Sequence, residues 1–256
     1  MSQAQHSFVA EHYAPRASDY VSSTVHSGGV DLDRIEQIVS GHAQARVLDL
    51  GCGGGHVSYR AAPHVAEVVA CDLTPGMLDE VARTAAERGL KNITIQQAAA
   101  ERLPFPDASF DFVLCRFTIH HWHDRQAGLR EARRVLKPGG RAVFIDVVSP
   151  AHPLLDTHLQ TIELLRDGSH VRNASTAEFM TALGAAGFEP TALSHRKMRM
   201  EFENWTARTK TPEVCKMALL HLQAHASAPV RDYFSIAPDG SFDLDAVTIE
   251  VTPGLV

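Results

Sequence analysis

The residues with the clearest chemical meaning form a glycine-rich turn after a short apolar run. The segment Val47-Leu-Asp-Leu-Gly-Cys-Gly-Gly-Gly-His56 places Asp49 in a run typical of a buried strand, and four glycines follow directly. Glycine lets the backbone bend sharply and lets a ligand approach the main chain, because no Cβ stands in the way. In open α/β sheets, ligands bind beyond the carboxyl ends of the strands, where this turn would lie. The acidic Asp49 favours a ligand with a cationic end over one with a pyrophosphate.

The spacing of the glycines argues against a dinucleotide site. A G-x-G-x-x-G fingerprint counted from Gly51 would need its third glycine at His56, and counted from Gly53 it would need one at Ser58. No G-K-[ST] follows, so the turn is not a phosphate-binding loop of that type either. Asp72 ends the next apolar run, where a carboxylate can accept both hydroxyls of a ribose. The alternative interpretation is that Asp72 only caps a turn or a helix.

The elements that position these residues alternate between strand and helix through the first 150 residues. Buried strands are predicted at Arg46–Leu50, Glu67–Asp72, Asn92–Gln96, Phe110–Arg116 and Arg141–Val148. Helices are predicted at Val57–Ala62, Pro75–Arg88 and Gln126–Leu136, the last one ending at the breakers Lys137-Pro-Gly-Gly140. Repeated strand–helix–strand units with short connections predict a parallel sheet covered on both faces.

Two regions lie outside this alternation. Residues 1–44 are predicted to form a helical N-terminal cap or lid. Residues 150–256 contain helical stretches and two strand-like runs, near Thr191–Phe202 and Ala246–Val251, that are expected to pair as an antiparallel edge of the sheet. The helical stretches are Leu154–Arg166, Thr176–Ala186 and Pro212–Ala226. The expected fold class is therefore α/β: a doubly wound, Rossmann-like, mostly parallel seven-stranded sheet with an antiparallel edge strand, in three α/β/α layers.

The composition of the chain indicates which kinds of binding partner to expect. The chain of 256 residues has a net charge of −6, which gives no electrostatic footprint for nucleic acid or an anionic membrane. No apolar run approaches the roughly 20 residues that span a bilayer, and the N-terminus lacks the features of a signal peptide. The four cysteines lie far apart without a C-x-x-C pair. We therefore expect a cytoplasmic protein with reduced thiols that acts on a small molecule.

Four segments, taken in order, resemble the motifs of class I S-adenosylmethionine-dependent methyltransferases. They are similar to the type 11 branch that contains the ubiquinone/menaquinone-biosynthesis C-methyltransferase, and they cover residues 45–148 in detail. The segments are Val47–Gly55, Asp72–Leu78, Ala100–Asp111 and Arg134–Gly140. The resemblance implies S-adenosylmethionine as cofactor, S-adenosylhomocysteine as product and a methyltransferase domain over residues 45–256, with a motif core at 45–148. The segment 166–172 resembles a less characterised bacterial subgroup, so the resemblance names no acceptor.

The resemblance also implies which residues hold the cofactor. Asp49 would orient the glycine loop and favour the ammonium group, and Asp72 would bind the ribose. The other residues predicted to contact the cofactor are Gly51, Cys52 and Gly53 at its methionine end, Leu73 and Met77 against the adenine, Ala99, Ala100 and Glu101 along the edge of that ring, the backbone of Arg116 beside the methionine moiety, and Tyr20 from the N-terminal segment.

One position departs from the family. An acid that hydrogen-bonds the adenine amino group often stands where this chain has Ala99. Adenine recognition would then depend on backbone groups or on Glu101. A lost neutral hydrogen bond costs only about 1 kcal/mol, so the cofactor prediction does not depend on it.

Three histidines lie beside the expected transfer site, in Thr118-Ile-His-His-Trp-His123 after the fourth strand. Only Asp124 offers another metal ligand nearby, so no metal site is predicted. A neutral imidazole can take a proton near physiological pH, and His120 or His121 is therefore the predicted catalytic base. The alternative is that these histidines only pack and hydrogen-bond structurally. A base is needed only if the acceptor must lose a proton.

The expected acceptor is a small, apolar or quinol-like molecule, methylated on carbon, oxygen or nitrogen. The chain has no Asn/Asp-Pro-Pro-aromatic segment and no Pro-Cys pair, which disfavours the amino groups of adenine or glutamine and cytosine carbon as acceptors. Two other functions remain open: a non-catalytic S-adenosylmethionine-binding protein, and an NAD(P)-dependent oxidoreductase, against which the glycine spacing argues. The oligomeric state is not predicted.

Overall fold

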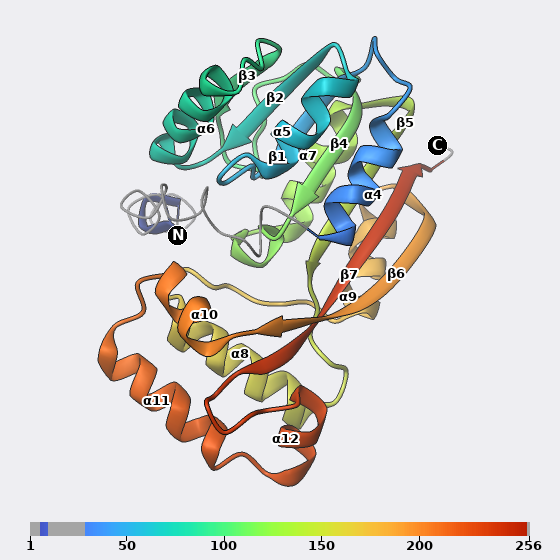
Figure 1. The fold of residues 1–256 in the computed structure, drawn as a ribbon. Coiled ribbons are helices and arrows are strands. Elements are labelled where there is room, and N and C mark those ends of the chain that lie inside the picture. The colour runs from blue at the N-terminus through green and yellow to red at the C-terminus, as the bar shows by residue number, and fades with distance from the viewer. Residues whose placement is uncertain (1–5, 10–28, 255–256) are drawn as a thin grey trace.

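A seven-stranded sheet forms the centre of the structure, a computed structural model that describes residues 6–9 and 29–254. The strand order is β3-β2-β1-β4-β5-β7-β6 (Figure 1). The first five strands pair in parallel, and β7 is antiparallel to both of its neighbours. The strands are β1 Arg46–Leu50, β2 Glu67–Asp72, β3 Ile93–Gln97, β4 Phe110–Arg116, β5 Leu136–Val147, β6 Phe188–Met200 and β7 Phe242–Pro253. The predicted fold class is confirmed, with the antiparallel pairing at one edge.

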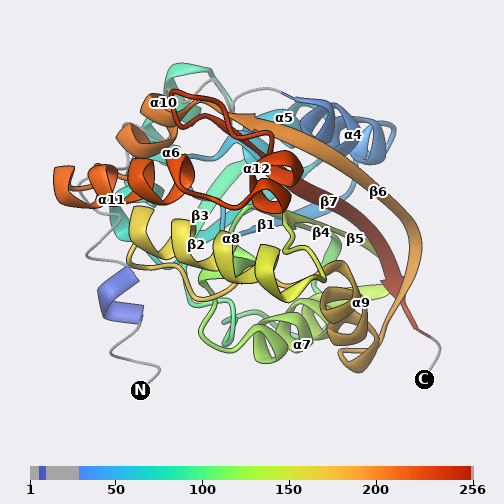
Figure 2. The same ribbon diagram turned by 90° about the horizontal axis from the view of Figure 1, so that it is seen from below.

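Helices cover both faces of this sheet, which makes three layers (Figure 2). On one face lie α4 (Val30–Val39), α5 (His56–Ala61) and α6 (Pro75–Glu87), and on the other lie α7 (Arg125–Val135) and α9 (Thr176–Ala185). Neighbouring residues of one strand serve opposite faces: Val68 packs with α4 and α5, while Val69 belongs to the core beneath α7 and α9. Burial on both faces explains why the parallel strands read as continuous apolar runs.

A second group of helices packs where β6 and β7 extend beyond the parallel strands (Figure 1). It comprises α8 (Pro153–Arg166), α10 (Phe202–Arg208), α11 (Glu213–Ala224) and α12 (Ala228–Phe234). Its own apolar core includes Trp205, Phe234 and Phe242, all buried. Because the two long strands pass from one part of the molecule to the other, this group forms a wall opposite the carboxyl ends of the parallel strands. Two 3-10 helices, η2 (Ala62–His64) and η3 (Ile119–His121), complete the described elements.

The predicted elements are present, with one correction at the start of β5. Residues 137–140 were predicted to break the chain after the helix, but β5 begins at Leu136 and includes them. Leu136 pairs with Phe110 and Arg141 with Phe112, so the register shifts and the breakers form an irregularity within the strand. The prediction failed because proline and glycine also fit a strand at a bulge. The short helices α10 and α12 were not predicted.

The structure describes only part of the predicted N-terminal cap. Residues 6–9 are helical, and α4 packs on α5 with Leu32 and Ile35 in the same core. The proposed cap over residues 1–44 lies largely outside the described residues and stays a prediction. Within the described ranges, no helix combines the length and apolar character that a membrane crossing needs.

Candidate functional site

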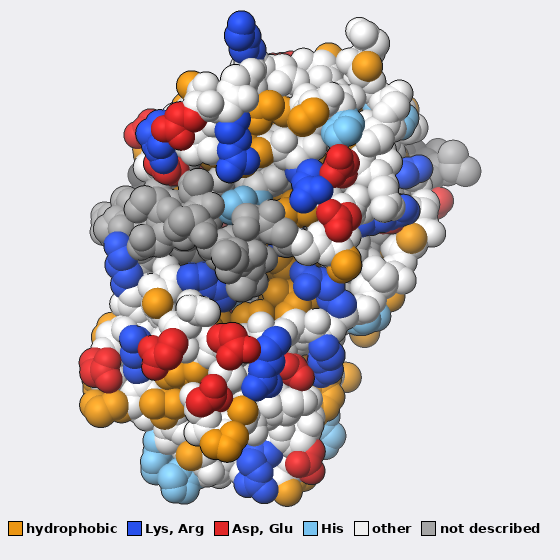
Figure 3. All heavy atoms as spheres, viewed as in Figure 1, with side chains coloured by type: hydrophobic (Ala, Val, Ile, Leu, Met, Phe, Trp, Pro, Cys, Tyr) orange, Lys and Arg blue, Asp and Glu red, His pale blue; other side chains and the backbone are white. Residues whose placement is uncertain are grey.

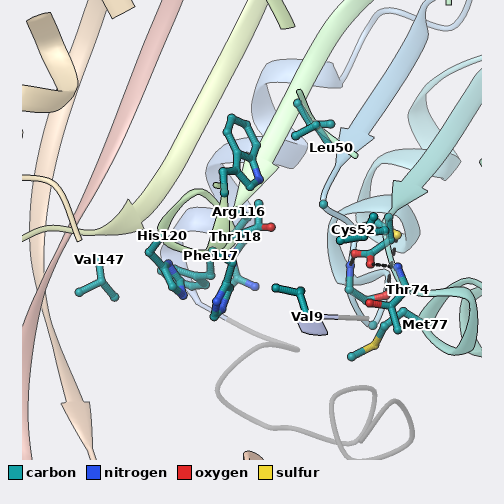
Figure 4. Close-up of a pocket in the computed structure, with 18 of the residues that line it drawn as sticks. Val9, Leu50, Cys52, Thr74, Met77, Arg116, Phe117, Thr118, His120 and Val147 are labelled. Carbon is teal, nitrogen blue, oxygen red and sulfur yellow. Dashed lines mark hydrogen bonds between the residues drawn. The ribbon is translucent and has the colours of Figure 1, made fainter. Parts of the chain in front are cut away.

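A pocket opens at the carboxyl ends of β1, β2 and β4 and reaches the wall built by α8, α10, β6 and β7. It contains about 1500 Å³ of empty space, including its open mouth. In Figure 4, Cys52, Thr74 and Met77 lie on one side, His120 and Val147 on the other, and Val9 between them. The pocket therefore lies at the edge where the sequence predicts a ligand.

The structure brings the predicted site residues together around this one pocket. Every predicted residue that the structure describes contributes to its lining: His120, His121, Asp49, Gly51, Cys52, Gly53, Asp72, Leu73, Met77, Ala99, Ala100, Glu101 and Arg116. Tyr20 lies outside the described residues. Their roles toward a ligand stay predictions.

The glycine loop is held against β2 and leaves a bare backbone facing the pocket. The amides of Gly51 and Cys52 both donate to the carbonyl oxygen of Cys71, at 2.8 and 2.9 Å. Gly51 and Gly53 have φ of +71° and +49°, in the left-handed region that favours glycine. A Cβ on Gly51 would overlap the side chain of Thr118, whereas a Cβ on Gly53 would meet no atom of residues 6–9 and 29–254 within 4 Å. The open space at Gly53 suits close approach of a ligand to the main chain.

Asp49 ties this loop to the helix that follows it. One carboxylate oxygen of Asp49 accepts hydrogen bonds from the backbone N–H of Ser58 (2.9 Å) and from its hydroxyl (2.6 Å). Burial raises the pKa of Asp49 from 3.8 to about 7, although the bonds from Ser58 oppose the shift. A cationic group beside this carboxylate would favour its ionised form. The hydrogen bonds to Ser58 are compatible with the predicted role in orienting the loop, and the attraction of an ammonium group stays a prediction.

Asp72 holds the turn after β2 and also lines the pocket. Its carboxylate accepts hydrogen bonds from the amides of Gly53 (2.9 Å) and Thr74 (2.8 Å). Burial raises the pKa of Asp72, and these backbone bonds oppose the shift. The turn-capping interpretation is thus present in the structure. A carboxylate has about four acceptor sites, so two backbone bonds leave room for ribose hydroxyls.

The predicted adenine side is completed by residues that sequence reasoning missed. Val9 packs with Leu73 and Met77 in a small apolar cluster. Glu101 lies 3.4 Å from His6 Nε2 and accepts a hydrogen bond from the Asp124 amide at 3.2 Å. Residues 6–9 therefore cover this side of the pocket. Nothing in the spacing of the sequence connects them with residues 73–101.

Thiol chemistry is not favoured at the pocket. Burial, with the nearby Asp72 and Asp49 carboxylates, raises the pKa of the Cys52 thiol well above its ordinary value, so the thiol stays protonated. In the part of the chain that the structure describes, no three His, Cys, Asp or Glu side chains are grouped to hold a metal ion.

His120 forms a buried pair with Asp146, at the end of β5. The imidazole Nδ1 lies 2.6 Å from one carboxylate oxygen, and the backbone N–H of His120 donates to the other at 3.2 Å. Burial lowers the pKa of His120, but the charge and hydrogen bond of Asp146, with Glu163 and Asp167, outweigh it and raise the pKa above 6.5. Nε2 has no hydrogen bond to the described residues, and the ring lines the pocket. This arrangement suits a base oriented by a carboxylate.

His121 differs sharply from its neighbour. Burial, with the adjacent His120, lowers the pKa of His121 to about 3. Its Nδ1 lies 3.2 Å from the Ser169 hydroxyl. His170, at a ring distance of 5.9 Å from His120, also has its pKa lowered to about 3 by burial. Of the two histidines predicted as bases, only His120 has both a carboxylate partner and a raised pKa.

The side chain of Arg116 is engaged away from the glycine loop. Its Nε donates to Asp31 of α4 at 2.5 Å, and Arg196 lies 3.2 Å from the same carboxylate. Burial lowers the pKa of Arg116, and Asp31 opposes that shift. The prediction that the Arg116 backbone lies beside the methionine moiety makes no demand on this side chain and stays a prediction.

The far wall of the pocket was not predicted. It is formed by a buried amide and an apolar group with an arginine: Asn173, Met198, Met200, Trp205, Arg208 and Leu244. Asp146, the partner of His120, was not predicted either. For Asp146 a signal existed, because it ends a buried strand as Asp49 and Asp72 do. The others come from segments with no recognisable motif.

Comparisons with known proteins indicate the family to which the chain belongs. Residues 48–144 match the family described as "Methyltransferase domain". The chain is 46% identical to the uncharacterized protein YafE of Escherichia coli over 78% of its length and 97% of that protein. It is 34% identical to the uncharacterized methyltransferase YcgJ of Bacillus subtilis over 93% of its length and 96% of that protein. The crystal structure of YcgJ superposes with a TM-score of 0.84, at 33% identity, over 88% of this chain and 98% of that one.

A third relative matches less than half of this chain. A demethylmenaquinone methyltransferase of Deinococcus radiodurans is 41% identical over 44% of this chain and 47% of its own length. The fold, the glycine loop with its two acids and the full-length similarity to YcgJ lead to one conclusion. The chain belongs to the family of S-adenosylmethionine-dependent methyltransferases.

Proposed function

We propose that this enzyme methylates a small, largely apolar or quinol-like molecule at a group that loses a proton, with His120 as the base. The observation that carries the proposal is the His120–Asp146 pair. It presents an imidazole whose Nε2 has no hydrogen bond to any described residue, in the same pocket as the glycine loop. A carboxylate-oriented base has a role in methyl transfer only if the acceptor must be deprotonated, as a hydroxyl or an acidic carbon must be.

Different residues of the chain would hold different parts of the cofactor. The loop at Gly51–Gly53 would take the methionine end, Asp49 the ammonium group and Asp72 the ribose, with Leu73 and Met77 against the adenine. The cofactor supplies, when bound, a methyl group activated by a sulfonium. The pocket orients donor and acceptor, and well-oriented reactants can lower a barrier by roughly 7–11 kcal/mol.

The base would act through Nε2 of His120. Asp146 fixes the ring through Nδ1 and stabilises the imidazolium that forms when Nε2 takes a proton. Proton transfer to a positioned side chain contributes typically 10²–10⁴-fold to a rate. His121, with its pKa near 3, stays neutral and does not serve as the base.

The side chains of the pocket wall beyond His120 support an acceptor of apolar character. Met198, Met200, Trp205 and Leu244 supply apolar surface there, which favours a small apolar body. The name of the Deinococcus relative, which acts on demethylmenaquinone, supports a quinol-like ring. On the face drawn in Figure 3, acidic and basic side chains are interspersed, which supports a small molecule rather than nucleic acid. The four free thiols support the proposed cytoplasmic location.

Two measurements test this function. Calorimetry with S-adenosylmethionine, S-adenosylhomocysteine and NADH should give binding of the first two only. S-adenosylhomocysteine release over a panel of phenols and reduced quinones should then identify an acceptor, and His120→Ala should lose turnover while keeping cofactor affinity. Binding of NADH alone would overturn the cofactor assignment. Cofactor binding without release for any compound would leave a binding protein instead.

A further inference from the structure

One buried amide in the pocket has no hydrogen-bond partner in the part of the chain that the structure describes. Asn173 is 1% exposed and lines the pocket, yet neither its Nδ2 nor its Oδ1 has a hydrogen-bond partner among residues 6–9 and 29–254. Buried polar side chains almost always have partners, because an unpaired one loses its hydration without compensation. A buried side chain that lines a ligand pocket and has no such partner has the properties expected of a group that hydrogen-bonds the ligand.

The position of this amide is fixed by the backbone around it. The Asn173 N–H donates to Gln160 Oε1 at 3.1 Å, and the Asn173 carbonyl accepts from Gln160 Nε2 at 2.8 Å. With both backbone groups held by one side chain of α8, the segment is anchored to the wall of the pocket. The unpaired amide is therefore a defined feature of the site.

The same segment is joined to the proposed base. The amides of Val171 and Arg172 both donate to the carbonyl oxygen of His120, at 2.9 and 3.1 Å. Asn173 is the next residue, and both Asn173 and His120 line the pocket. A molecule that presents an oxygen to His120 therefore lies in the same pocket as the Asn173 amide.

We propose that Asn173 determines acceptor specificity by hydrogen-bonding a second oxygen, next to the one that is methylated. A primary amide offers two donor hydrogens and one acceptor oxygen, so it pairs fully with a hydroxyl and as donor with a carbonyl. The acceptor class is then a small apolar ring with two neighbouring oxygen substituents. This inference rests on the proposed function, because it places the acceptor beside His120.

The first arm of the test measures stability and needs no ligand. Asn173→Leu replaces the amide by an apolar side chain of similar size. Since the amide pairs with none of the described residues, the urea midpoint of the variant should equal or exceed that of the wild type. Gln223→Leu is the matched control: Gln223 is also 1% exposed with both amide atoms unpaired among the described residues, and it does not line the pocket. A lowered midpoint for Asn173→Leu alone would show a structural role and overturn the inference.

The second arm measures recognition, with 2,3-dihydroxynaphthalene and 2-naphthol as probes. The two share a ring system and differ by one neighbouring hydroxyl. In the presence of saturating S-adenosylhomocysteine, calorimetry should show the diol binding to the wild type and to Gln223→Leu about tenfold more tightly. In Asn173→Leu the preference should disappear while S-adenosylhomocysteine affinity stays unchanged.

The outcomes separate the inference from the function on which it rests. Equal affinity for the two probes in the wild type, or no binding of either, would overturn the role of Asn173 while S-adenosylhomocysteine binding remained intact. Failure to bind S-adenosylhomocysteine would instead contradict the proposed function, and the stability arm would still test Asn173 by itself.

Discussion

Asp31 and Arg116 form a buried ion pair that joins helix α4 to the end of strand β4. Asp31 Oδ2 lies 2.5 Å from Arg116 Nε, and the two side chains are 0% and 4% exposed. Arg116 lines the pocket, and its guanidinium also lies 4.6 Å from the ring centroid of Phe117. The helix that precedes the sheet therefore holds the strand end beside which the proposed transfer takes place.

Removing Asp31 should destabilise the protein strongly. Asp31→Ala leaves Arg116 and Arg196 without the carboxylate that both face, and loss of one partner of a buried pair costs about 3–5 kcal/mol. The free energy of unfolding in urea measures the effect. Asp33→Ala is the control on the same helix, because Asp33 is 59% exposed and its pair with Arg60 lies at the surface. Equal losses in the two variants would contradict the importance of the buried pair.

The His120–Asp146 pair predicts a shift in the pH dependence of turnover. Only neutral His120 can accept a proton, so the rate should rise with pH through the raised pKa of this histidine. In Asp146→Asn the opposing charge is lost while burial remains, so the pKa should fall and the rising limb should move to lower pH. The plateau rate should also fall, because the ring loses its orienting carboxylate.

A neighbouring histidine offers the comparison for that experiment. His121→Asn should leave the rising limb of the rate profile in place, since His121, with a pKa near 3, is neutral throughout the range measured. If instead this variant moved the limb and Asp146→Asn did not, the base would be assigned to the wrong histidine.

Asp72 is predicted to bind the ribose as well as to hold its turn. Asp72→Ala should weaken S-adenosylhomocysteine binding more than tenfold, from two hydroxyl contacts worth about 1–2 kcal/mol each. The same loss is expected for 5′-methylthioadenosine, which keeps the ribose and lacks the amino-acid end. Calorimetry on both ligands checks this. Unchanged affinities in a folded variant would leave Asp72 with its turn contacts to Gly53 and Thr74 only.

Asp49 should make cofactor binding depend on pH. Because burial raises its pKa to about 7, the carboxyl of the free protein is largely protonated below that pH. A ligand ammonium favours the ionised form, so S-adenosylhomocysteine affinity should increase as the pH rises from about 5.5 to 7.5. Asp49→Asn cannot ionise and should show a flatter profile. Identical pH profiles for wild type and variant would show that Asp49 does not meet the ammonium group.

The sequence predicted best those pocket residues that stand at the ends of predicted strands, beside turn residues. Asp49 and Asp72 stand at strand ends next to turn residues, so their place at the pocket followed from local pattern alone. The partner of His120 did not follow, because Asp146 approaches it through the pairing of β4 with β5, in which Arg116 lies opposite Ile145. Register between strands is a tertiary property that periodicity does not contain.

Asn173 illustrates the same limit more strongly. It belongs to a segment without helix or strand periodicity, and hydrogen bonds from Gln160 and to the carbonyl oxygen of His120 bring this segment to the pocket. The residues at 137–140 show the opposite case, where a strong local signal for a break was overridden by pairing of β5 with β4. Long-range pairing decided both outcomes.

A variant in the glycine loop, compared with a matched variant elsewhere, separates an effect on ligand binding from an effect on folding. Gly53→Ala forces a left-handed φ on alanine, at a cost of about 1 kcal/mol, but its Cβ would meet no atom of the described residues within 4 Å. Gly89→Ala shares both properties, with φ of +70° and open space, after helix α6 and outside the pocket lining. Both variants should lose similar stability in urea. Only Gly53→Ala should lose S-adenosylhomocysteine affinity, by more than tenfold, because the added methyl occupies the surface that the methionine end approaches. Equal affinities in the two variants would move the cofactor away from Gly53.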